Sequence, residues 1–440
     1  MPASARFKDV AAEMLNVFKT EAVVAFDPTP LPPDVDHRFT LSVVTANGTK
    51  VDLTLASRDD ELMVRISADA ELSDAERGAL AGLAKGFQQA VDGMAMDVPQ
   101  LRLGELSRFG GGPLRSIDLH AAVSLPTIPP GTQTLDFHID GAHRSVSVDG
   151  PAGRLDISVR TDSLEALGTR QEQDKAIGSY LKQFDQAAAR GHGDPHLMAM
   201  FKDAFSDLSR TSNRDGPAET PAKIGGAWAL SREDRAVLTG LADFSAAVTQ
   251  TPRLNNPVRL DEVTGFHYAV SQETRINGTS WADRSLAQTQ HSRLNAQFHT
   301  PLRPGGSLAF SSSSETQNYR YHQIEDSARS DVALEYKEGR LRKAILEQSV
   351  NQSERIREYV LGRMMSDTTI PVKQRLVRDL VAVLGPYQME HGRRLHEESR
   401  EAREERREKS LQALNENMLL VGTGLELASR AKLRIGTIVE

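Results

Sequence analysis

Residues 38–55 read RFTLSVVTANGTKVDLTL, and this stretch decides the fold class of the first half of the chain. Apolar and polar side chains alternate on both sides of Asn47-Gly48, a pair typical of a two-residue hairpin turn. A third strand-like run follows at residues 62–67. Ser73 and Glu76 then have the spacing of a capping box, which opens a helix to about Met94. The stretch predicts a hairpin, a third strand and a helix that covers their apolar face.

The same pattern returns further along the chain. A second alternating segment turns at Asp140-Gly141, which lies 93 positions after Asn47-Gly48. The helix behind it repeats the apolar residues of the first helix 97 positions later, so that Ile177 matches Leu80. Nearly constant offsets for a turn and for a helix indicate a tandem duplication of roughly 95 residues. We predict two hairpin–strand–helix modules, at residues 34–110 and 118–210.

The helix pattern appears a third time without a hairpin before it. Residues 230–242 share Leu, Ser, Arg, Leu, Gly, Leu and Ala with residues 72–84 at a constant offset of 158. Residues 211–225 are rich in Pro, Gly and polar side chains and are typical of a linker. We therefore predict a linker and a partial third module helix over residues 211–258.

The first helix also carries a resemblance. Residues 72–93 read LSDAERGALAGLAKGFQQAVDG, a pattern that resembles one found in uncharacterised proteobacterial proteins. The resemblance covers about 100 residues around the first module, and most of its matching positions are core positions. It implies a Gram-negative source and implies no chemistry.

The second half of the chain changes character. Residues 259–338 alternate apolar and polar side chains around another hairpin turn, Asn277-Gly278, which predicts an antiparallel β-meander. We predict that residues 339–440 are helical, with spans at 340–365, 371–384 and 387–418. Pro371 suits the first turn of a helix, and Gly385-Pro386 suits a break between two helices.

The predicted fold is α+β: two tandem hairpin–strand–helix modules, then the β-meander, then a long-helix C-terminal region. Residues 1–26 precede the modules, and residues 4–20 show the apolar spacing of an amphipathic helix, which either packs on its own domain or serves as an export address or membrane-surface helix. Asp27 to Pro33 read as a stiff Pro-rich linker. No long apolar region follows the N-terminus, so we expect a cytoplasmic protein or one exported without a cleaved signal, and not an integral helical membrane protein.

Composition excludes several classes of protein. The 440 residues contain no cysteine, which excludes disulfide scaffolds, thiolate zinc sites, iron–sulfur clusters and cysteine nucleophiles. The formal net charge of −7 argues against a dedicated nucleic-acid binder. Hydrophobic residues make up 39%, so the chain can form globular cores.

One short motif could hold a metal ion. His192, Asp194 and His196 place two imidazoles and a carboxylate within five residues. Asp194 followed by Pro195 is also a typical helix start, with Asp as the N-cap and Pro in the first turn, and we favour this structural interpretation. We predict no catalytic residues and no cofactor.

The stretch from Arg393 to Lys409 alternates Arg and Glu with few apolar residues, so we expect a solvated helix. It either projects as a docking surface for a protein partner or lies on a compact bundle. We therefore expect a non-catalytic structural or protein-interaction protein of a Gram-negative bacterium. A secreted effector or membrane-active toxin is the first alternative, because the meander is amphipathic. An enzyme with a site assembled from distant residues is the second.

Overall fold

The computed structural model describes residues 6–19, 35–59, 61–108, 112–127, 130–162, 167–210, 228–384 and 400–432. The fold is α+β, with antiparallel sheets and a small number of helices. Contacts divide the chain into two units. Unit 1 comprises Met1–Asp162, Asp194–Asn213 and Ala246–Thr251, and unit 2 comprises Ser163–Gly193, Arg214–Ser245 and Pro252–Glu440.

The predicted hairpin at residues 38–55 is confirmed. Strands β1 (His37–Thr45) and β2 (Lys50–Arg58) pair in the register that places Val43 opposite Val51. Gly48 has φ 91°, the left-handed backbone that favours glycine at this turn. The remaining strands of unit 1 are β3 (Glu61–Ala68), β4 (Leu114–Leu125), β5 (Gly131–Asp140), β6 (His143–Gly150) and β7 (Gly153–Arg160).

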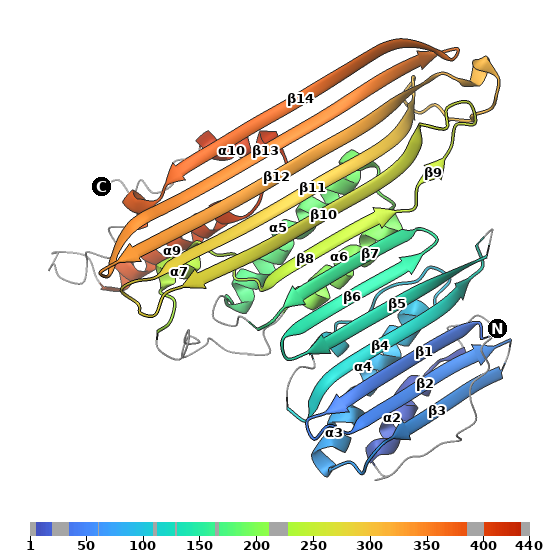
Figure 1. Cartoon of the computed structure of the whole chain (residues 1–440), viewed down its shortest axis with the longest axis vertical. Coiled ribbons are helices and arrows are strands. Elements are labelled where there is room, and N and C mark those ends of the chain that lie inside the picture. The colour runs from blue at the N-terminus through green and yellow to red at the C-terminus, as the bar shows by residue number, and fades with distance from the viewer. Residues whose placement is uncertain are drawn as a thin grey trace. The chain divides into compact units, whose positions relative to one another are not determined.

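These strands form one antiparallel sheet in unit 1, in the order β7-β6-β5-β4-β1-β2-β3 (Figure 1). Strand β4 pairs with both β1 and β5, so the strands of the two predicted modules join directly. Helix α5 (Arg170–Gly191), the predicted helix of the second module, belongs to unit 2. The duplication itself stays a prediction from the sequence.

Helices cover the apolar face of the unit 1 sheet. They are α2 (Val10–Asn16), α3 (Asp74–Gly82), α4 (Ala84–Met94) and α6 (Pro195–Ser209). The predicted capping box is present: the Ser73 hydroxyl accepts from the Glu76 amide, and the Ser73 amide donates to the Glu76 carboxylate at 2.9 Å. The predicted helix 73–94 is divided between α3 and α4 at Leu83.

The N-terminal helix packs on its own unit. The ring of Phe7 meets Phe39 edge to face, with 5.2 Å between centroids. The Gln88 side chain donates to the Phe7 carbonyl at 2.9 Å and accepts from the Ala12 amide at 3.1 Å. The Gln88 side chain thus provides an acceptor for one N–H group in the first turn of α2. N–H groups in the first turn of a helix have no acceptor within the helix. The predicted linker, Asp27 to Pro33, lies outside the described residues.

The unit 2 sheet consists of five long strands in the order β10-β11-β12-β13-β14. They are β10 (Val263–Asn277), β11 (Ser285–Pro301), β12 (Tyr319–Lys337), β13 (Arg340–Val360) and β14 (Arg363–Asp379). The short β9 (Arg253–Leu254) pairs with β10, and β8 (Asp243–Gln250) lies mostly in unit 1. The meander predicted for residues 259–338 is therefore present and continues further than predicted.

The helices predicted at 340–365 and 371–384 are wrong for residues 340–379, which form β13 and β14. Leu341 and Ile345, and again Leu346 and Val350, stand four apart and imitate a helical stripe. Polar residues at covered positions of the strand hide its true alternation. Two turns that need left-handed backbone, at Glu338-Gly339 and Leu361-Gly362, make hairpins instead.

The partial third helix at 230–242 is also shorter than predicted. Helix α7 covers only Arg232–Ala236, and Ser231 and Asp234 form its capping box. Gly240 has φ 78°, and a Cβ there would come within 3.0 Å of the Gly168 Cα. Gly240 therefore occupies a left-handed position between α7 and β8 that a side chain would strain. The predicted linker at 211–225 lies outside the described residues.

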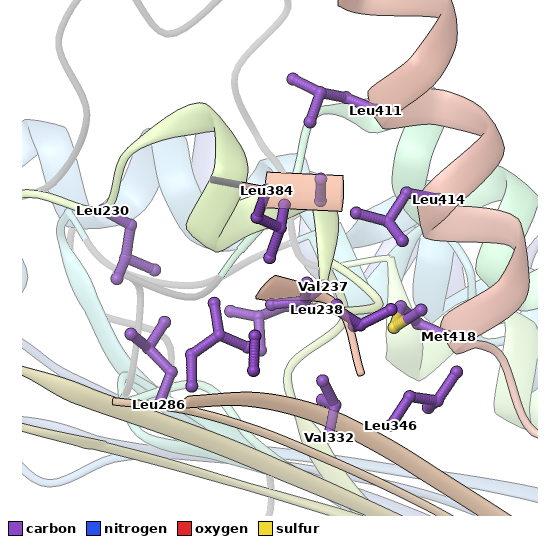
Figure 2. Packing of buried hydrophobic residues seen from close by; sticks show 14 of the residues in the cluster. Leu230, Val237, Leu238, Leu286, Val332, Leu346, Leu384, Leu411, Leu414 and Met418 are labelled. Atoms are coloured by element: carbon purple, nitrogen blue, oxygen red, sulfur yellow. The ribbon is translucent and has the colours of Figure 1, made fainter. Parts of the chain in front are cut away.

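Helices α5, α7, α9 (Arg400–Met418) and α10 (Gly424–Lys432) complete unit 2. Figure 2 shows how side chains from the residues flanking α7, from α9, from the sheet and from the segment after β14 meet in one apolar cluster. Its labelled members are Leu230, Val237, Leu238, Leu286, Val332, Leu346, Leu384, Leu411, Leu414 and Met418. None of the described helices is long and apolar enough to cross a membrane.

Candidate interaction surface

The centre of the unit 2 core is polar. Gln290 of β11 donates to the Met418 carbonyl at 2.8 Å and accepts from the Leu420 amide at 2.8 Å. Gln348 of β13 donates to the carbonyls of Asn417 and Leu419. Both glutamines are almost fully buried. They hold the connection between α9 and α10 on the sheet, because buried backbone groups need hydrogen-bond partners.

A charged network surrounds the C-terminal end of α5. Arg190 donates to both oxygens of Asp326, at 2.5 and 3.2 Å, and to Glu354 at 3.4 Å. The His322 ring lies 2.8 Å from Glu354 through Nδ1 and 2.9 Å from the Thr300 hydroxyl through Nε2. Burial opposes the charge of Arg190, but Asp326 and Glu354 raise its pKa.

Hydroxyl, imidazole and carboxylate in this order resemble a nucleophilic triad. In this network, however, the Glu354 carboxylate is shared with Arg190, and Arg190 is held by Asp326. The groups therefore tie α5 to three strands, β11, β12 and β13. We assign the network a structural role.

His192 and Asp194 of the candidate metal motif have separate structural roles. His192 ends α5 with left-handed backbone, φ 56°, and its ring stacks on Phe298 with 3.8 Å between centroids. Asp194 is the N-cap of α6 and accepts from the amides of His196 and Leu197 at 3.0 and 2.9 Å. The favoured capping interpretation is confirmed. Among the described residues, no group of three or more His, Asp or Glu side chains is placed to hold a metal ion.

A second polar cluster lies at the far end of the unit 2 sheet, around the fully buried Glu262. Its carboxylate accepts from the Tyr319 hydroxyl at 2.6 Å and lies 3.3 Å from the His299 ring. Burial opposes ionisation, but hydrogen bonds from His299 and Tyr319 lower the pKa of Glu262. Burial and the neighbouring Glu262 raise the pKa of Tyr321 to about 12. One carboxylate oxygen of Glu262, Oε2, makes these contacts, whereas Oε1 has no hydrogen-bond partner and lies 3.7 Å from the Arg357 guanidinium.

Strand β14, the 17-residue strand at the end of the unit 2 sheet, is exposed at nearly every position. Its apolar side chains face solvent: Met365 is 64% exposed, Ile370 50% and Val377 54%. No strand formed by the described residues pairs with its outer edge. By comparison β3, the edge strand of unit 1, has only 8 residues. Long exposed edges with apolar side chains are templates for pairing with another strand.

Charged side chains of β14 are already ordered by its neighbour β13. Asp367 accepts two hydrogen bonds from Arg355, at 2.8 and 2.6 Å. Arg375 donates to Glu347 at 2.8 Å. Each pair is diagonal, because Asp367 lies opposite Arg357 and Arg375 lies opposite Ser349. Residues two apart on a strand share a face, so both pairs lie on the same face of the sheet. The strand therefore presents positioned charges as well as apolar groups.

The charged helix is described only from Arg400 onward, so the segment from Arg393 to residue 399 lies outside the described residues. Arg407 bonds to Glu233 of α7, and Lys409 pairs with Glu405 at 2.7 Å. Leu411, Leu414 and Met418 are buried in the cluster of Figure 2. Docking of a partner on this helix stays a prediction.

The chain matches no protein-family model, no curated protein and no solved structure.

Sequence reasoning missed β14 because it assigned the strand to helices. Thr368, Thr369, Ile370 and Val372 are β-branched, and β-branched residues favour strands over helices. These β-branched residues on either side of Pro371 are the sequence signal that favours a strand here. Pro371 was interpreted as a helix start, although proline is also tolerated on edge strands.

Proposed function

We propose that this chain is a non-catalytic structural or protein-interaction protein that binds a protein strand along the outer edge of β14. The observation that supports the proposal is the 17-residue edge strand with exposed Met365, Ile370 and Val377. An added strand would satisfy main-chain groups along the edge, and alternate side chains would provide specificity.

The length of β14, 17 residues, supports this proposal. Natural edge strands are often short, or carry charges, prolines and bulges that discourage pairing. Strand β14 carries one proline, at residue 371, and six charged side chains, of which Asp367 and Arg375 are paired to β13. Exposed apolar side chains that gather on one strand indicate a contact surface.

Site-specific photocrosslinking in the native host tests the proposal. A photoreactive amino acid replaces Thr369, in the middle of β14, and in a control replaces Ser42, on a strand of unit 1 that has neighbours on both sides. We expect a crosslinked protein species from position 369 and none from position 42. Failure to crosslink from positions 365, 369 and 375, at normal expression, would overturn the proposal.

The compartment is tested separately. The proposal includes export without a cleaved signal as one of two locations, the cytoplasm being the other. Fractionation of the host, with antibody detection in cytosol, membrane and medium and a cytosolic marker as control, distinguishes them. Protein in the medium with the marker retained assigns the β14 partner to the outside of the cell.

A further inference from the structure

We infer that a second copy of this chain occupies the β14 edge, and that the two β14 strands pair antiparallel about a twofold axis at Pro371. The inference rests on the proposed function and names its partner. Two copies related by a twofold axis present the same strand to each other, so the sequence of β14 must complement its own reverse.

The sequence of β14 meets this requirement for charge. With the axis at Pro371, Arg363 lies opposite Asp379 and Asp367 lies opposite Arg375. Symmetry repeats each pairing, so four pairs of opposite charge form and no like charges face each other. Opposite charges on facing residues stabilise paired strands, and like charges destabilise them.

The apolar residues fit the same register. Met365 lies opposite Val377, and Ile370 lies opposite Val372, so exposed apolar side chains meet across the axis. Neighbouring registers fit less well. With the axis at Ile370, the only oppositely charged residues that face each other are Asp367 and Lys373. With the axis at Val372, no oppositely charged residues face each other.

The register also continues the charge pairs already present within one chain. Glu347 pairs with Arg375, and Asp367 pairs with Arg355, all on one face of the sheet. Pairing Arg375 with Asp367 of the second copy gives a row of alternating sign: Glu347, Arg375, then Asp367 and Arg355 of the second copy. Pro371 has no N–H, so the two copies together lack two donors at the axis.

The absence of cysteine allows a direct test of the register. Pro371→Cys places a thiol opposite its own copy, and we expect a disulfide-linked dimer of the full-length protein under mild oxidation. Met365→Cys alone and Val377→Cys alone should not crosslink, whereas an equal mixture of the two should. Equal crosslinking of Met365→Cys alone would overturn the register.

Charge reversal tests the pairing without a covalent bond. The wild type is expected to have a mass of about 96 kDa by light scattering, twice the 48.2 kDa of one chain. Asp367→Arg and Arg375→Asp each place like charges opposite each other and should raise the dimer Kd about tenfold or more. Mixing the two variants restores both opposite pairs and should produce a heterodimer. Unchanged circular dichroism checks that each variant folds.

The outcomes separate this inference from the proposed function. A monomeric wild type with no Pro371→Cys dimer, together with a crosslink from position 369 to a different protein, overturns self-pairing and retains the proposed function. A monomeric wild type with no crosslink from β14 overturns both. A Pro371→Cys dimer and a heterodimer of the charge variants support both.

Discussion

The two units have differently built cores. In unit 1 the covered face of β1 is apolar at every central position, with Phe39, Leu41 and Val43 all buried. In unit 2 the corresponding centre of the sheet holds buried glutamines, among them Gln288, Gln290 and Gln348. Apolar burial is non-directional, whereas a buried amide is stable only when its partners are in place. Unit 1 should therefore respond to changes of volume, and unit 2 to the loss of single hydrogen bonds.

Spectroscopy can follow the two units separately. Both tryptophans of the chain, Trp228 and Trp281, lie in unit 2. Tryptophan fluorescence therefore reports unfolding of unit 2, and far-ultraviolet circular dichroism reports both units.

The largest effect is expected from Phe39→Ala in unit 1. Phe39 is fully buried and its ring contacts Phe7, so its removal leaves a cavity. We expect a loss of about 3–5 kcal/mol in the free energy of unfolding. Urea denaturation followed by circular dichroism measures it, with Thr40→Ala on the uncovered face as the control. An equal shift of the fluorescence transition would show that the two units unfold together.

The next effect is expected in unit 2. Gln290→Ala leaves the Leu420 amide without its side-chain partner and removes one of two side-chain donors to the Met418 carbonyl, the other being the Ser330 hydroxyl. The unsatisfied amide and the lost hydrogen bond cost about 2–4 kcal/mol in total. Fluorescence-detected denaturation measures the change, and Gln323→Ala, on the other face of the same sheet, is the matched control. Equal effects of the two substitutions would show that the amides carry no special role.

A pH-dependent effect is expected in unit 1. Burial, and next the charge of Asp203, raise the pKa of Asp207 to about 6 from its usual 3.8. A raised carboxyl pKa stabilises the folded unit below pH 3.8, and this stability is lost as the pH rises through 6. Asp207→Asn should therefore stabilise unit 1 by about 1–2 kcal/mol at pH 7.5, after allowance for solvent screening.

Denaturation of wild type and Asp207→Asn at pH 3.5 and 7.5, followed by circular dichroism, measures this difference. The two proteins should be equally stable at the lower pH. A variant that is less stable than wild type at pH 7.5 would contradict the assigned cause.

The smallest effect concerns the uncovered face of unit 1. His138 lies 2.6 Å from Asp118 and 3.4 Å from Asp140. Burial opposes the charge, but hydrogen bonds with these two carboxylates raise the pKa of His138. The resulting stability is fully present below pH 6.5 and is lost as the pH rises through the folded-state pKa.

Asp118→Asn should therefore cost unit 1 about 0.5 kcal/mol more at pH 5.5 than at pH 8. Circular dichroism should detect this difference, and tryptophan fluorescence should not. A pH-independent cost would show that the carboxylate acts on His138 only through a neutral hydrogen bond.

The sequence predictions that the structure confirms all rest on local signals. The Asn47-Gly48 turn, the Ser73 capping box and the Asp194 N-cap each involve groups within a few residues of one another. Residues 340–379 were assigned wrongly because polar residues occupy covered strand positions, and their partners lie elsewhere in the chain. Gln348 of β13, for example, donates to the Leu419 carbonyl, which is 71 residues away in the chain.

The candidate surface at β14 could not be predicted from the sequence either, because it also depends on distant parts of the chain. An edge strand is defined by the neighbour it lacks, and only the order of the strands shows that β14 is last. Likewise, His192 and Asp194 are two positions apart in the sequence, but the structure assigns one to a ring stack and the other to a helix cap.

The sequence by itself determined the turns, the helix caps and the alternation of unit 1, because backbone preferences and nearby side chains decide these features. Only the tertiary structure decided that β1 pairs with β4, that glutamines fill the centre of unit 2 and that β14 is an edge. Pairing and burial are decided by which distant groups satisfy one another, and that choice depends on the free energy of the whole fold.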